Sequence, residues 1–256
     1  MDELRRTDLL PPIVDLTEIL ENNGLHREKT DIEALLEYIG TMENKMDQML
    51  KEMQGMREEV TKLSNRGIKA RCTQLLSATE NTLRNIRSGI STMAKNLSNS
   101  ASKAIKAFRE NGKDALIKAV YAMRIPSLLS HLKNGFNKAS ESMKKSANNF
   151  DVMRNELHEV GKHTENTFRA MVGKEPKKVE PLKSDNGVLA KMRDMYNGLS
   201  KSFTKMENGT DALISKLDKS KEKADERASV KSELKKLKKG KDKGTGRKPE
   251  RDRTAK

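Results

Sequence analysis

The sequence predicts an all-α protein: an elongated, coiled-coil-like helical bundle followed by a disordered basic tail. Three observations predict this fold class. Apolar residues recur in alternating steps of three and four, the spacing of a helix that packs along one narrow seam. Charged residues make up 35% of the 256 residues, as in helices whose outer faces stay in water. Aromatic residues make up only 3%, and no period-two run of β-branched residues indicates a strand.

Residues 1–29 are predicted to form a short helix and a turn. Pro12 suits the first turn of a helix that extends to residue 21. Gly24 follows two asparagines and is typical of the left-handed residue that ends a helix. Thr30 and Glu33 have the spacing of a capping box, so we expect the next helix to begin at Thr30.

Residues 30–66 carry the strongest signal, a Met-rich heptad helix. From Ile32 to Leu63 the apolar residues follow the steps of three and four without a miss. Methionine fills irregular gaps, so the stripe is interpreted as an internal helix-packing seam; the alternative is an adaptable surface that docks a partner helix. The candidate seam residues are Ile39, Met42, Met46, Met49, Met53, Met56, Val60 and Leu63.

Residues 67–172 form a basic long-helix region. We expect a turn at Gly67 and a break near residues 111–126, where Asn111 and Gly112 favour a turn and Pro126 limits a short apolar helix. A further stripe extends over residues 129–171. Its polar positions have apolar neighbours, Ala147 and Phe168, that are candidates to face inward instead.

The C-terminal part is divided by composition. Residues 173–187 contain two prolines and are predicted to be a Pro/Lys linker. Residues 188–230 carry a last heptad stripe, which we expect to kink at Asn208 and Gly209. Residues 231–256 are rich in lysine and glycine and have almost nothing apolar to bury, so we expect a disordered basic tail.

Charge is distributed unevenly. Residues 1–65 hold 8 basic and 15 acidic residues, residues 66–150 hold 16 and 4, and residues 231–256 hold 12 and 4. The basic middle either packs against the acidic N-terminal part or contacts phosphate groups. Because aromatic residues are scarce, nucleic-acid binding would be weak and independent of base sequence. The candidate contacts are Arg66, Lys69, Arg71, Arg84, Arg87, Lys95, Lys103, Lys106, Arg109, Lys235, Lys236, Lys238 and Lys239.

No catalytic, cofactor-binding or metal-ligating set is predicted, and the chain is expected not to be an enzyme. His158 and His163 are five residues apart and diverge by about 140° on a helix, whereas a helical zinc motif needs a spacing of four. Cys72 is interpreted as a structural thiol. One cysteine allows no intrachain disulfide, and the N-terminus lacks the pattern of a signal peptide, so a cytoplasmic location is expected.

Three segments resemble an uncharacterised group of helical proteins encoded on conjugative and other mobile elements of Gram-positive gut bacteria. They are Pro11-Pro12-Ile13-Val14-Asp15-Leu16, Leu35-Leu36-Glu37-Tyr38-Ile39 with the Met stripe, and Asn186-Gly187-Val188-Leu189-Ala190-Lys191-Met192. The resemblance implies a bacterial cytoplasmic accessory protein and supplies no activity or site residues.

The leading functional prediction is a helical structural or interaction protein that self-associates or docks partner helices. The first alternative is a nucleic-acid-binding protein that uses the basic middle and tail. A weaker alternative is peripheral membrane association through residues 115–132, the most apolar stretch, whose charged residues make it unsuitable as a membrane span.

Overall fold

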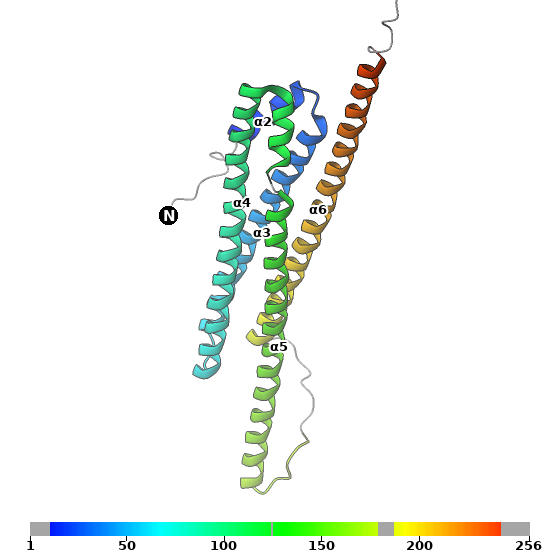
Figure 1. Ribbon diagram of the computed structural model, residues 1–256. Helices are drawn as coiled ribbons and strands as arrows, with labels where there is room; N and C mark the ends of the chain where they lie inside the picture. Colours follow the sequence, from blue (N-terminus) through cyan, green and yellow to red (C-terminus); the bar gives the residue numbers. More distant parts are fainter. Residues whose placement is uncertain (1–10, 124, 179–186, 242–256) are drawn as a thin grey trace, which may run out of the picture. The chain divides into compact units, whose positions relative to one another are not determined.

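The computed structural model describes residues 11–123, 125–178 and 187–241. Within these ranges the chain forms helices joined by turns and contains no strand, which confirms the predicted all-α fold class. The helices are α2 (Pro11–Asn22), α3 (His26–Thr61), α4 (Arg66–Tyr121), α5 (Ile125–Met171) and α6 (Val188–Lys241) (Figure 1).

The chain divides into two units, Met1–Ile214 and Ser215–Lys256. The first contains α2 to α5 and the first half of α6. The described part of the second is the remainder of α6, which continues past the predicted boundary near residue 230 to Lys241, because lysine, glutamate and leucine all favour helix. The rest of the predicted disordered tail, residues 242–256, lies outside the described residues.

The connection between α2 and α3 is a tight turn closed by Gly24. Gly24 has a φ of 66°, and the next amide, that of Leu25, donates to the Leu20 carbonyl at 2.8 Å. Leu25 is buried and α3 begins directly after it at His26. The predicted helix start at Thr30 is therefore wrong: the Thr30 hydroxyl lies inside α3 and donates to the His26 carbonyl.

A short turn also joins α3 to α4. The side-chain oxygen of Asn65 accepts a hydrogen bond from the Ile68 amide at 3.1 Å and so caps the first turn of α4. The sequence predicts this turn at Gly67. The structure instead places Gly67 inside the first turn of α4, because Asn65 supplies the cap two residues earlier.

The chain reverses direction again within α4. Gly112 has φ 74° and ψ −163°, which is not helical, and divides α4 into a long segment and a short one that ends at Tyr121. The predicted turn at Asn111 and Gly112 is confirmed. α5 then begins at Ile125 with Pro126 in its first turn, where the missing N–H removes no intrahelical hydrogen bond.

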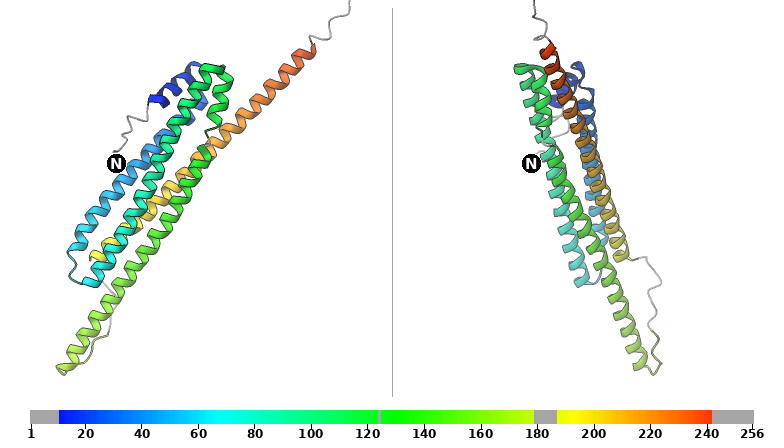
Figure 2. Two further views of the ribbon diagram at one scale, coloured as in Figure 1. Left: turned by 60° about the vertical axis from the view of Figure 1, so that its left-hand side comes forward. Right: turned by 45° about the vertical axis from the view of Figure 1, so that its right-hand side comes forward.

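In the first unit, α3, the long segment of α4, α5 and the first half of α6 lie alongside one another, and consecutive long helices run in opposite directions (Figures 1 and 2). Each helix buries one apolar stripe. Two aromatic pairs join α5 to α6: the ring centroids of Phe136 and Phe203 are 6.3 Å apart, and those of Phe150 and Tyr196 are 5.2 Å apart.

Tyr38 of α3 reaches α6 beside Gly209. Its hydroxyl donates to the Met206 carbonyl and lies 3.0 Å from the Thr210 hydroxyl. A Cβ atom on Gly209 would lie 2.8 Å from the Tyr38 hydroxyl oxygen. The predicted kink at Asn208 and Gly209 is wrong, because α6 continues as a helix through both residues. The glycine leaves room for the tyrosine, and α6 stays helical at this position.

Candidate interaction site

The Met-rich stripe lies inside the chain's own core. Six of its candidate residues are buried, Ile39, Met42, Met46, Met49, Met53 and Val60. Met56 is only half-buried, and Leu63 lies half-buried beyond the end of α3. Along most of the stripe, the structure therefore agrees with the first of the two interpretations, an internal packing seam. The side chains that would have to form a docking surface there are covered.

A polar pair is buried beside this seam. The Thr79 hydroxyl of α4 lies 2.9 Å from the Tyr196 hydroxyl of α6, and both residues are buried. Burial raises the pKa of Tyr196 to about 12. Cys72, one heptad before Thr79, is also buried, and burial raises the pKa of its thiol to about 11. A thiol held in its neutral form is a poor nucleophile, which agrees with the interpretation of Cys72 as structural.

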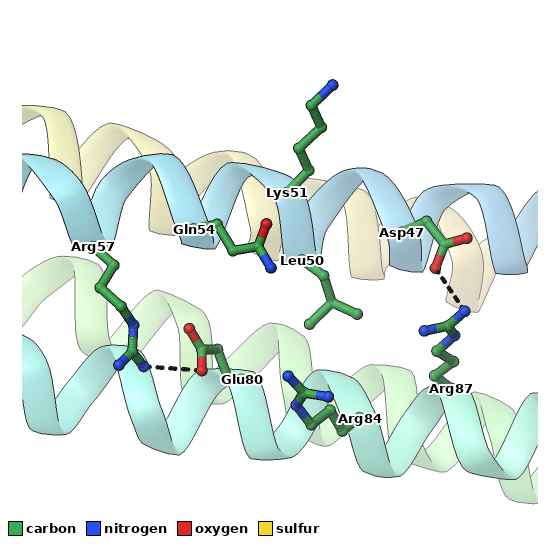
Figure 3. A pocket seen from close by; sticks show the side chains of 8 residues that line it. All are labelled: Asp47, Leu50, Lys51, Gln54, Arg57, Glu80, Arg84 and Arg87. Atoms are coloured by element: carbon green, nitrogen blue, oxygen red, sulfur yellow. Dashed lines mark hydrogen bonds and ion pairs between the residues drawn. The ribbon is translucent and has the colours of Figure 1, made fainter. Parts of the chain in front are cut away.

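An open groove of about 640 Å³ lies between α3 and α4 (Figure 3). Arg57 pairs with Glu80 across it at 2.9 Å, and Asp47 pairs with Arg87 at 3.2 Å. Arg84 lies on α4 between these two ion pairs. The two carboxylates balance part of the basic charge that lines the groove. These two ion pairs therefore join α3 to α4 across the groove.

The basic candidate residues of the middle region are spread along α4. Four of them, Arg84, Lys95, Lys106 and Arg109, are exposed and fall within about 60° of one another on a helix of 3.6 residues per turn. Lys106 pairs with Glu110 one turn later. Three further candidates lie on this side of α4: Arg66 is exposed, Lys69 is half-buried and Arg87 pairs with Asp47. The exposed residues Arg71 and Lys103 lie on other sides of the helix.

The four candidate lysines near the C-terminus, Lys235, Lys236, Lys238 and Lys239, belong to the last turns of α6. Their side chains lie outside the described part of the structure.

The segment proposed for membrane contact contributes to the core. Its apolar side chains Leu116, Val120, Met123, Leu129 and Leu132 are buried. Among the described residues, the structure contains no helix with an apolar stretch long enough to cross a bilayer.

The largest group of exposed apolar side chains among the described residues lies at the end of α5, and the sequence does not single it out. Glu59 near the end of α3 pairs with Lys191 at the start of α6, and Arg193 pairs with Asp151 of α5. Residues near the start of α4 line a groove together with residues of α5, and Glu156 is the last of these α5 residues. These contacts place the end of α3, the start of α4 and the start of α6 level with about residue 156 of α5. α5 continues beyond all three ends (Figures 1 and 2).

We call residues 157–171 the α5 tip. They continue the stripe that α5 buries, because Phe150 and Met153 lie on the same side of the helix as Leu157. Exposure rises along this stripe: 8% for Met153, 38% for Leu157, 61% for Val160, 67% for Phe168 and 80% for Met171. Ala147 faces inward as predicted, but the inward position predicted for Phe168 is wrong, because the neighbouring helices have ended.

A backbone clamp holds the tip in shape. Asn166 exchanges two hydrogen bonds of 2.8 Å with the backbone of Lys177, and Arg169 donates to the Glu175 carbonyl at 2.9 Å. Gly173, with a φ of 73°, turns the chain back after α5. Asn166 and Arg169 lie roughly 150° around the helix from the exposed stripe, counting about 100° per residue. The clamp therefore leaves the apolar stripe uncovered.

Side chains that could bind a metal do not cluster in the described ranges. No three His, Cys, Asp or Glu side chains converge there as metal ligands would. His158 and His163 lie on different sides of the tip, as their spacing predicts. Lys162 and Lys177 hold the pKa of Glu165 below its usual value by hydrogen bonding, so this carboxylate stays ionised beside two ammonium groups.

The comparisons with known proteins give a family and no function. A search of curated proteins and a search of solved structures found no match to the chain. One family model matches residues 11–256, and its description reads "Family of unknown function (DUF6674)". A match over this length, which takes in all five helices, shows that the chain belongs to the DUF6674 family.

Proposed function

We propose that the protein is a non-enzymatic helical structural protein that associates with other protein helices through the α5 tip. The observation that carries this proposal is the exposed apolar stripe of the tip, which continues the buried stripe of the bundle. A helix with one apolar face gains stability when a second helix covers that face. Single exposed apolar residues are common on proteins, but a contiguous row of them marks an interaction site.

The remaining surface supports the same function. The Met-rich seam is occupied by the chain's own helices, and the α3–α4 groove contains ion pairs. Cys72 is buried and its thiol is held neutral. Among the described residues, the tip therefore has the largest group of exposed apolar side chains that a partner helix could cover. On the resemblance to proteins of mobile elements, we further propose that the protein acts as a cytoplasmic accessory protein of such an element.

Site-specific photo-crosslinking in the native cells tests the proposal. A photoreactive amino acid replaces Val160 or Phe168 on the stripe, or Asn155 as a control on an exposed position of the same helix. We expect covalent protein adducts, with this chain or another protein, from positions 160 and 168 and not from position 155. Equal labelling from all three positions, or no adduct from any of them, would contradict a docking role for the tip.

A second candidate function is sequence-nonspecific binding to nucleic acid. It is favoured by the exposed row of Arg84, Lys95, Lys106 and Arg109 on one side of α4. Such binding depends on counterion release, so the affinity should fall steeply with salt. Titration of the protein with duplex DNA and with RNA between about 20 and 300 mM salt tests this function. Absence of binding at the lowest salt would exclude it.

A further inference from the structure

We propose that the α5 tips of two copies of this chain pair in antiparallel orientation, centred on Thr164. The inference rests on the proposed function and names the partner: a second copy of the same chain. Four observations select this occupant: the symmetry of the stripe, the match in size between Gly161 and Phe168, the absence of charge on the face, and the length of α5 beyond the bundle.

The apolar stripe reads nearly the same in both directions. Leu157 and Phe168 are eleven residues apart, and so are Val160 and Met171. Eleven residues make three helical turns, so the two spacings keep these side chains in one straight row. An antiparallel pair centred on Thr164 places Leu157 of one copy level with Met171 of the other. It also places Val160 level with Phe168, so that each apolar residue meets an apolar residue.

Along one edge of the stripe, a large side chain of one copy meets a glycine of the other. Gly161 and Phe168 lie within about 20° of each other around the helix axis, and therefore on the same edge of the face. In the antiparallel pair, the ring of Phe168 from one copy comes next to Gly161 of the other. No heavy atom lies within 4 Å of the position that a Cβ atom on Gly161 would take. The space left by the glycine can therefore receive the aromatic ring.

The face carries no charge. The residues within about 60° of the stripe centre are all uncharged, and they are Leu157, Val160, Gly161, Thr164, Thr167, Phe168 and Met171. The charged groups Lys162, Glu165 and Arg169 lie outside this face, where they bind each other or the segment after α5. An uncharged face matches itself and offers no cation to a phosphate backbone.

The length of α5 beyond the bundle also fits. The other helices end at about the level of residue 156, and the tip ends at Met171. An overlap centred on Thr164 aligns residue 156 of one copy with residue 172 of the other. Each tip then reaches the end of the other copy's bundle without entering it, and the full exposed stripe of both copies is covered. The turn at Gly173 and the backbone clamp lie off the contact face.

Analytical ultracentrifugation of the full-length protein between about 1 and 200 µM tests the association. Fewer residues meet here than in a standard interface of about 20–30 per side, so we expect a reversible dimer with a dissociation constant of micromolar order. Raising the salt concentration should leave the constant unchanged within about threefold, because no charge pair is buried. A monomer throughout this range would overturn the proposal.

Three variants locate the contact. Val160→Glu combined with Phe168→Glu should abolish the dimer while circular dichroism shows an unchanged melting temperature, because both side chains are exposed in the monomer. Gly161→Lys raises helix propensity yet obstructs the space for Phe168, so it should weaken the dimer at least tenfold. Val152→Glu is the control, since Val152 is 55% exposed on α5 away from the stripe. A dimer lost equally in this control would contradict the assignment.

Disulfide trapping determines the orientation. We expect Leu157→Cys protein mixed with Met171→Cys protein to form a mixed disulfide dimer under mild oxidation, and neither variant to form one alone. A disulfide in Leu157→Cys protein alone would indicate parallel helices and overturn the antiparallel pairing. If the purified chain stays monomeric while position 160 captures a different protein in cells, self-pairing fails and the proposed function stands. If both experiments fail, the proposed function fails as well.

Discussion

At the scale of single residues, the polar groups that enter the core make specific hydrogen bonds. The Thr79 hydroxyl pairs with Tyr196, and the Thr210 hydroxyl donates to the Met206 carbonyl at 2.7 Å. A buried hydroxyl without a partner would cost about 1–3 kcal/mol, so each of these bonds matters more for the fold than an exposed ion pair does.

Gly209→Ala should lower the free energy of unfolding by about 1–3 kcal/mol. Alanine favours helix over glycine, but its Cβ would lie 2.8 Å from the Tyr38 hydroxyl oxygen. Gly198→Ala is the matched control on α6, where no atom lies within 4 Å of the added carbon. It should raise stability by up to about 1 kcal/mol. Urea titration of both variants measures the difference, and opposite signs are required.

Cys72 should make stability fall as the pH rises from 9 to 11. Burial raises the pKa of the folded-state thiol from 9.0 to about 11. Its contribution is therefore complete below pH 9, where the thiol is neutral in both states, and is lost as the pH rises through 11. Cys72→Ala should unfold with a shallower dependence on pH across this interval. Parallel curves for the two proteins would contradict the raised pKa.

At the scale of helices, the heptad spacing predicts which side of each helix faces the core. It does not predict over what part of its length neighbouring helices cover that side. Ile39 and Met153 are buried as the pattern indicates. Residues 157–171 repeat the same pattern and are exposed, because coverage depends on where α3, α4 and α6 end. Helix boundaries are likewise set by tertiary contacts: Leu25 is buried at the turn, so α3 begins before the capping box at Thr30.

Asn166→Ala should loosen the end of α5. The side chain of Asn166 makes two hydrogen bonds to Lys177, and a helix of about 15 residues without packing partners is marginal in water. Amide hydrogen exchange in residues 165–171 should become at least several-fold faster. Asn155→Ala, at an exposed position on the same helix, is the control and should leave exchange at the tip unchanged. Equal exchange rates in the two variants would show that the clamp does not stabilise the tip.

At the scale of the whole molecule, methionine is divided between interior and surface. The sequence contains 14 methionines, and the structure buries Met42, Met46 and Met53 completely while Met171 is 80% exposed. Composition alone does not separate the two groups, since both occupy heptad positions. The difference arises only when helices of unequal length are assembled.

Among the described methionines, mild peroxide treatment should therefore oxidise Met171 first and Met42, Met46 and Met53 last, because oxidation follows exposure. Peptide mass spectrometry at several times of treatment measures the order. Pairing of two tips would also slow oxidation of Met171 as the protein concentration rises. Early oxidation of Met46 in folded protein would contradict the buried seam.

The hydrogen bond between the Thr79 and Tyr196 hydroxyls also fixes the axial position of α6 relative to α4. A heptad pattern repeats every seven residues, so apolar contacts alone would tolerate a shift of one repeat along the axis. Such a shift would place Tyr196 opposite Cys72 or Ile86 and leave the threonine hydroxyl without its partner in the interior. One buried pair thus gives a repetitive sequence a single axial alignment.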